Sequence, residues 1–365
     1  LARTKPIIYD VCVTLKHRMS RPYLIIPQLI KQPTWGGDYI LKLKRWDSSS
    51  DRIGQSYELS SSSRLAEKIL NSDDLQSAKN DDHDSIPISE VEPVNILIKL
   101  NQAHGNSFQL HIKHGQQSDT WKPKPESWYF LEKGYISLGL NPSTSIEEYK
   151  KTCLIIESQV KTLSEQVQNG SIDIDNARSQ AHHFIQEQNP WQFVNRYQID
   201  QFDLIDLSMG GIHHSWEENL ENTVGNVVYE VQLNVTDDES TMRSFDQGKI
   251  KDDGSIRPIT IDDYFEHIDT NPKHNTFEYL TRTPDGNTLL KTDYYVLEKY
   301  NISGKQPQQT LGLWHHIYVQ DGTIELTSDE TTLHISKGYS CFIPSRVESY
   351  VVSSTKATIL VTHSP

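Results

Sequence analysis

Sustained helical patterns are confined to one part of this chain, residues 141–189, and this restriction constrains the fold more than any other feature. Apolar residues recur at helical spacing over residues 149–167, after an S-x-x-E capping box and before an Asn-Gly stop. A second helix is predicted from about 174 to 188, where a proline follows. Residues 23–59, 94–140 and the region after the helices instead form short extended runs broken by Gly and Pro. The sequence therefore predicts a mainly β protein with an α-helical insertion at 141–189.

Residues 60–93 differ from the strand-like regions on either side. Serine and acidic residues dominate this segment, and only residues 64–70 have a short helical pattern. Such a polar composition is typical of a segment outside the packed core. We therefore expect a surface excursion with one short helix.

Four residues form a donor set suited to a divalent metal: Gln109, His111, Glu126 and His213. Gln109 and His111 are two apart in FQLHIK, a run with strand-like alternation, so both side chains point to the same face of a sheet. With one carboxylate and a second imidazole, this N2O2 set fits zinc in a site with an open position, whereas a closed structural site more often uses cysteine. His214 is expected to face the opposite side if its segment is extended.

Composition excludes several classes of partner. The formal net charge of −14 opposes binding to nucleic acid or to an anionic membrane, because both require clustered Lys and Arg. No apolar run reaches about 18 residues and no signal-peptide core is present, so we expect a cytoplasmic protein. Cys12, Cys153 and Cys341 are far apart and are predicted to be free thiols. The first residue is Leu rather than Met, which suggests trimming or excision from a longer polypeptide.

A series of motifs gives the chain a resemblance to a known family. In order they are TWGGDYI, IGQSYELS, ILIKLNQ, FQLHIK, KPKPESWYFL, VNRYQIDQFDLIDLSMGGIHH, VVYEVQLN, MRSFD and DDGSIRPITIDDYFEHID. From about residue 23 to the C-terminus, their order and spacing resemble those of type I mannose-6-phosphate isomerases (phosphomannose isomerases) of the short bacterial kind. That family implies a cupin scaffold and a zinc-dependent aldose–ketose isomerase, which interconverts mannose 6-phosphate and fructose 6-phosphate through an enediolate.

The resemblance also implies roles for individual residues. One zinc ion per chain would be bound by Gln109, His111, Glu126 and His213, with Lys124 and Arg243 beside the sugar. Zinc and a fixed guanidinium can both stabilise the developing enediolate charge. Lys124 and Glu230 are both candidates for the acid/base group, and the sequence does not decide between them.

The substrate would be a small sugar phosphate, so the pocket needs local positive charge. Lys99, Lys124 and Arg243 are the candidates, and Asp246 is expected to orient Arg243. The loop at 236–240 is longer than in the family pattern, and we interpret it as a surface turn. The sequence leaves the oligomeric state open.

An internal similarity indicates the domain organisation. Residues 201–214 and 337–350 each contain a turn, an apolar strand, a tight turn and another strand, which predicts two cupin-type β-barrels of the jelly-roll kind. The N-terminal catalytic barrel would comprise 1–140 and 190–270, and the C-terminal barrel 271–365. In the second copy Ser349 occupies the position of His213, so the C-terminal barrel is expected to lack the metal.

Several departures from the family pattern affect the rim of the pocket. Gln55 replaces the usual Glu, Lys113 and His114 replace an acidic pair, and residues 207–211 read LSMGG instead of IPAGT. These changes keep open the alternative of a non-catalytic sugar-phosphate-binding cupin relative. A cupin iron oxygenase is a third hypothesis, but the additional ligand Gln109 argues against it.

Overall fold

The computed structural model describes residues 20–47, 51–78, 84–113, 115–116, 118–215, 223–329 and 331–365. Cys12 and His114 lie outside these residues. The two cysteines within them, Cys153 and Cys341, are buried and free, as predicted. Across the same ranges, no helix combines the length and the apolar character needed to cross a bilayer.

The fold is mainly β, as predicted, and its longest helices are the two of the insertion. The helices are α2 (Tyr39–Lys44), α3 (Leu75–Ala78), α4 (Ile146–Gln168), α5 (Ile174–Gln188), α6 (Asp237–Ser240), α7 (Ile261–His267) and α8 (Phe277–Leu280). α4 begins at the predicted capping box, where the Ser145 hydroxyl accepts a hydrogen bond from the Glu148 backbone N–H at 3.3 Å. α5 has the predicted bounds because Asp173 caps its first turn and a proline follows its end.

Two antiparallel sheets form the N-terminal half of the molecule. The first has the order β11 (Leu204–Asp206), β8 (Glu126–Phe130), β13 (Asn226–Leu233), β6 (Ile96–Ala103), β3 (Ile53–Leu59) and β2 (Gln28–Lys31). The second has the order β10 (Val194–Ile199), β9 (Gly134–Leu140), β12 (Gly211–Ser215), β7 (Phe108–His111) and β14 (Met242–Phe245). Their facing surfaces enclose the candidate site.

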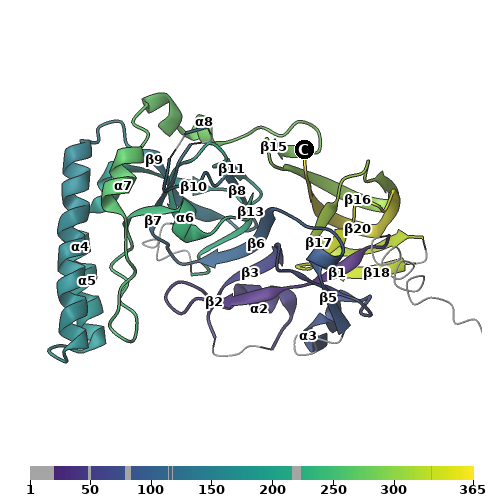
Figure 1. The fold of residues 1–365 in the computed structure, drawn as a ribbon, viewed down its shortest axis with the longest axis horizontal. Coiled ribbons are helices and arrows are strands. Elements are labelled where there is room, and N and C mark those ends of the chain that lie inside the picture. The colour runs from purple at the N-terminus through teal and green to yellow at the C-terminus, as the bar shows by residue number, and fades with distance from the viewer. Residues whose placement is uncertain are drawn as a thin grey trace, which may run out of the picture.

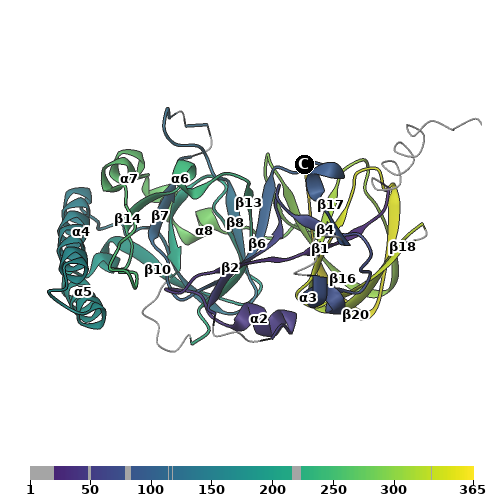
Figure 2. The same ribbon diagram turned by 60° about the horizontal axis from the view of Figure 1, so that its bottom comes forward.

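The third sheet forms the other end of the molecule. Its order is β15 (Thr288–Lys291), β16 (Val296–Gln309), β20 (Ser349–His363), β17 (His315–Ser328), β19 (Ser340–Ile343), β1 (Tyr23–Ile26), β4 (Arg64–Ala66) and β5 (Ser85–Pro87), with β18 (Thr331–Ser336) paired to β17. Figures 1 and 2 show these strands at the end opposite the α4–α5 hairpin. In the described part of the chain no closed barrel is found, so the architecture is one of facing and curled sheets.

The structure corrects the interpretation of residues 60–93. Arg64–Ala66 is a strand, not the start of a helix, because it pairs with β1 on one side and β5 on the other. Leu65, Ile86 and Ile88 are buried in the core. The segment is therefore part of the C-terminal sheet and not a surface excursion.

The α4–α5 hairpin covers the outer face of the five-stranded sheet (Figure 1). Tyr149 and Ile156 of α4 share a buried cluster with Phe108, Leu110 and Ile212 of the sheet. The sheet is thus apolar on the hairpin side, which leaves its opposite face for polar side chains.

Candidate metal centre

Three buried side chains converge between the two N-terminal sheets. His111 ends β7, Glu126 begins β8 and His213 lies on β12. The Glu126 Oε1 atom is 2.9 Å from His213 Nε2 and 3.5 Å from His111 Nε2. One potential ligand atom from each residue lies within 4.8 Å of the others, and each side chain is at most 1% exposed. The donors are close enough to surround a single ion.

Backbone carbonyls fix both imidazoles in a ligand orientation. His111 donates from Nδ1 to the Ser240 carbonyl at 2.7 Å, and His213 donates from Nδ1 to the Gly211 carbonyl at 3.0 Å. Both Nε2 atoms are buried and face Glu126, and they have no other hydrogen-bond partner among the described residues. Burial lowers the pKa of His111 to about 4, against the opposing effect of Glu126, so this ring is neutral at physiological pH. A neutral ring held through Nδ1, like that of His111, presents its Nε2 lone pair to a metal.

Gln109 lies beside this triad on the same strand as His111. Its backbone is paired with His213 across β7 and β12, and the alternation of β7 places its side chain on the face of His111. The Gln109 amide donates to the Ser107 hydroxyl at 3.4 Å. His214 is on the opposite face, as predicted, with its ring 4.1 Å from that of Phe108 in the hairpin core.

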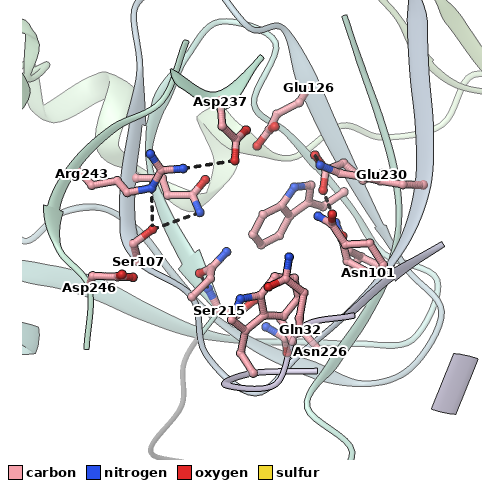
Figure 3. A pocket seen from close by; sticks show the side chains of 18 of the residues that line it. Gln32, Asn101, Ser107, Glu126, Ser215, Asn226, Glu230, Asp237, Arg243 and Asp246 are labelled. Atoms are coloured by element: carbon pink, nitrogen blue, oxygen red, sulfur yellow. Dashed lines mark hydrogen bonds and ion pairs between the residues drawn. The ribbon is translucent and has the colours of Figure 1, made fainter. Parts of the chain in front are cut away.

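Two cations and one carboxylate lie next to the triad, and Figure 3 shows two of these residues, Asp237 and Arg243, near Glu126. Lys124 Nζ is 3.0 Å from Glu126 Oε2 and 3.4 Å from Asp237 Oδ1. Arg243 is 3.1 Å from the other Asp237 oxygen, and it donates from Nε to the Ser107 hydroxyl at 3.2 Å. The neighbouring carboxylates raise the pKa of Lys124 despite its burial, so its ammonium stays protonated.

The 236–240 loop is a mostly exposed surface turn, as interpreted, and through Asp237 it also lines the site. It forms α6, whose last carbonyl orients His111 and whose first residue is Asp237. The sequence did not reveal Asp237, because an acidic run at a turn usually faces solvent. Asp246 was expected to orient Arg243, but the carboxylate that contacts Arg243 is that of Asp237. Asp246 instead lies 3.7 Å from Arg257.

Glu230 lies across the cavity from Arg243, on β13 (Figure 3). It is 3.1 Å from Lys99 Nζ and accepts a hydrogen bond from the Asn101 amide. Burial raises the pKa of Glu230 to about 7, although Lys99 opposes the shift. A carboxyl group that titrates near neutral pH is suited to proton transfer.

Glu126, Glu230 and Asp237 line an inner cavity of about 100 Å³. Its lining includes all three cations proposed for a sugar phosphate, Lys99, Lys124 and Arg243, together with Gln55 from the altered rim. Lys113 does not line it, because its ammonium pairs with Asp269 and donates to His274 at 3.1 Å.

The fold and this centre define a mainly β protein with a buried His–Glu–His site, and its fold is that of the mannose-6-phosphate isomerases. Residues 285–364 match the family model described as mannose-6-phosphate isomerase, cupin domain. No curated protein matches the chain in sequence. The predicted resemblance to this family is thus confirmed, by its cupin model at the C-terminus and by the fold of its solved members.

Solved structures extend the likeness over most of the chain. The mannose 6-phosphate isomerase from Bacillus subtilis has a TM-score of 0.62 at 16% identity, covering 94% of this chain and 99% of that one. A putative mannosephosphate isomerase from Archaeoglobus fulgidus has a TM-score of 0.61 at 17% identity, covering 94% and 98%. A zinc-bound mannose 6-phosphate isomerase has a TM-score of 0.63 at 11% identity, covering 94% and 99%. At such low identities the likeness establishes the fold and not the reaction.

Proposed function

We propose that this protein is a zinc-dependent aldose–ketose isomerase that interconverts mannose 6-phosphate and fructose 6-phosphate. The observation that carries the proposal is the buried triad of His111, Glu126 and His213, with two Nε2 atoms that have no other partner in the described chain. The names of the similar structures, one of them zinc-bound, support the choice of reaction and of metal.

The donor set fits zinc. His111, His213, Glu126 and Gln109 would hold the ion through two imidazole nitrogens and two oxygens, a combination that suits a catalytic site with an open position. When bound, zinc would act as a Lewis acid on the sugar oxygens and stabilise negative charge there. The carbonyls of Ser240 and Gly211 keep the two imidazoles correctly oriented.

The remaining side chains divide the other tasks. Glu230 is the better candidate for the base that moves a proton between C1 and C2, because its pKa is raised to about 7 whereas that of Lys124 is raised away from neutrality. Arg243 and Lys124 supply fixed positive charge for the oxygens that become negative in the enediolate. Arg243 lies across the cavity from Glu230 (Figure 3), so the sugar would lie between the acid/base group and this cation.

The alternative is a non-catalytic relative that binds a sugar phosphate. It rests on Gln55, which among the described residues is the one departure from the family pattern named above that lines the inner cavity. Lys113 gives it little support, because this side chain is engaged with Asp269 and His274 outside the cavity. A coupled assay of purified protein with mannose 6-phosphate separates the two functions, since turnover is expected only from the isomerase.

The ligand assignment predicts the metal content of a His111→Ala variant. Wild-type protein should contain one zinc per chain, and the variant should lose it together with activity, because a three-donor remnant binds the ion weakly. Metal analysis of both proteins measures this outcome. His183→Ala is a matched control, since His183 is exposed on α5 and should keep both zinc and turnover. Full zinc occupancy and activity in His111→Ala would contradict the assignment.

A further inference from the structure

A second, larger cavity adjoins the inner one. Its volume is about 570 Å³, which lies within the range typical of small-molecule sites. Its walls are formed by α5, the loop 246–252 that follows β14, residues 32–34 that follow β2, and the single residues Arg52 and Arg257. Gln32, Asp246, Lys249 and Arg257 line both cavities, so the two spaces are contiguous.

The outer cavity is positively charged although the chain is strongly acidic. Five cationic side chains line it against two carboxylates, whereas the whole chain has a net charge of −14. The cations are Arg52, Arg178, Lys249, Lys251 and Arg257, and the carboxylates are Asp246 and Asp252. Clustering of cations in a concave site concentrates anions there.

The carboxylates neutralise only part of this charge. Arg178 is 2.8 Å from Asp252 and also donates to the Ile250 carbonyl. Arg257 lies 3.7 Å from Asp246, too far for a good hydrogen bond. Arg52 donates to the Gly36 carbonyl. Within the described ranges, the carboxylate found to interact with Lys251 is that of the exposed Asp253, which does not line the cavity. Positive charge thus remains for a ligand to neutralise.

We propose that the outer cavity is a second anion site, which binds a small phosphorylated ligand separately from the metal-centred inner cavity. Three arginines favour phosphate, because the planar guanidinium matches two phosphate oxygens at once. The uncharged wall of Gln32, Pro33 and Thr34 leaves space for the organic part of the ligand. Such a ligand would join the helical hairpin to the sheet, since its contacts come from α5 on one side and from Arg52 on the other.

Inorganic pyrophosphate is a suitable probe for this site. Calorimetric titration of metal-free protein excludes binding through a metal at the inner centre. Wild type should bind one pyrophosphate per chain, and Arg178→Gln/Lys251→Glu should bind at least 10-fold more weakly. Lys251→Glu alone should also bind more weakly, and within the described ranges it removes no ion pair with a carboxylate that lines the cavity. Lys151→Glu/Arg346→Gln changes the net charge equally at exposed positions elsewhere and should bind like wild type.

Three results would overturn the proposal. Equal affinity of the cavity variants and wild type would show that these cations bind no anion, and equal weakening in the control pair would show only non-specific attraction. Titration of mannose 6-phosphate in the same way tests whether the outer cavity binds the phosphate group of the proposed substrate or that of a separate ligand. If Lys251→Glu weakens it in parallel with pyrophosphate, the cavity is the outer end of the inner site and not a second one.

Discussion

Asp237 connects the two cations of the candidate site. Its two carboxylate oxygens lie 3.4 Å from Lys124 Nζ and 3.1 Å from the Arg243 guanidinium. Lys124 contributes most to lowering the pKa of Asp237, and Lys99 and Arg243 add to the effect, so the carboxylate is charged throughout the neutral range. The Asp237 side chain is 57% exposed, whereas that of Arg243 is 9% exposed. Asp237 is thus the solvent-facing side chain that holds a buried guanidinium in place.

We expect Asp237→Asn to reduce kcat/KM by roughly 10- to 100-fold, because small misplacements of a catalytic group cost this much. The loss should appear mainly in kcat, since Asn retains the size of the side chain but not the charge that orients Arg243. Steady-state kinetics of Asp238→Asn, which removes a neighbouring exposed carboxylate, provides the control. An unchanged kcat in Asp237→Asn would show that Arg243 needs no carboxylate partner.

The kinetics of an Arg243→Ala variant distinguish transition-state stabilisation by Arg243 from substrate binding by Arg243. If its guanidinium acts on charge that develops in the transition state, Arg243→Ala should lower kcat by on the order of 100-fold or more. If it anchors the phosphate alone, KM should rise while kcat stays nearly constant. Zinc content should be normal, since Arg243 is not among the proposed ligands. Wild-type values of both constants would identify it as a structural arginine.

The sequence predicts the candidate ligand triad but not the residues that hold it in place. Gln109 and His111 are predicted to share a face because strand alternation is a local property. His111 and Glu126 meet across two sheets, and only the family pattern connects them. Asp237 and Ser107 are missed because each contacts a partner that is distant in the sequence. Asp237 is 113 residues from Lys124, and Ser107 is 136 residues from Arg243.

The elements differ in how far local sequence determines them. α4 and α5 are predicted with accurate bounds because apolar periodicity, caps and stops all lie within the helices or beside them. β4 is missed because its strand conformation depends on pairing with β1, more than 35 residues earlier in chain order. β1 itself pairs with β19 through the Tyr23–Phe342 register, which no local pattern indicates.

An ion pair between β16 and β20 predicts how stability depends on pH. His363 Nε2 lies 3.6 Å from Glu298 Oε2. Burial opposes the charged imidazole, but Glu298 and the Ser364 carbonyl outweigh it and raise the pKa of His363 above its ordinary value of 6.5. His363 in turn contributes most to lowering the pKa of Glu298 below its ordinary value of 4.5.

His363→Gln should therefore be most destabilising, relative to wild type, between about pH 4.5 and 6.5. The pKa of His363 is higher in the folded state than in the unfolded state, so protonated His363 contributes its full stabilisation below pH 6.5. This contribution is lost as the pH rises through the folded-state pKa of His363. The lowered pKa of Glu298 sets the acid limit, because its contribution is lost as the pH falls below 4.5. Urea unfolding across this range measures the difference, with the exposed His334→Gln as control. A difference that is constant with pH would exclude the pair.

The N-terminal and C-terminal parts of the molecule share one hydrophobic core. Tyr229 and Ile98 of the six-stranded sheet pack in the same cluster as Tyr318, Phe342 and Leu360 of the C-terminal sheet. The mainly β class follows from alternation along the chain. The shared core does not follow from this pattern. It forms because β1, β4 and β5 belong to the C-terminal sheet, whereas β2 and β3, from the same part of the chain, belong to the six-stranded sheet. We therefore expect cooperative unfolding of the whole described chain.

A buried ion pair lies inside this interface. Lys44 Nζ of α2 is 2.8 Å from Glu58 Oε1 of β3, and the two side chains are 0% and 2% exposed. Lys44 also donates to the Gly338 carbonyl at 2.7 Å, and Glu58 accepts from the Ser340 hydroxyl at 3.0 Å, both in the C-terminal sheet region. Burial lowers the pKa of Lys44, and Glu58 only partly offsets the effect. Each charge therefore depends on the other.

Lys44→Met should destabilise the protein by about 3–5 kcal/mol, because it leaves the Glu58 carboxylate buried without a cation. Lys44→Met/Glu58→Gln should recover much of this loss, since no unpaired charge remains. Lys42→Met is a matched control on the same helix, where an exposed pair with Asp38 contributes at most about 1 kcal/mol. Denaturant unfolding followed by circular dichroism and tryptophan fluorescence should give coincident transitions for all variants, because both parts share one core. A Lys44→Met cost no larger than that of Lys42→Met would show that the buried pair does not hold the two parts together.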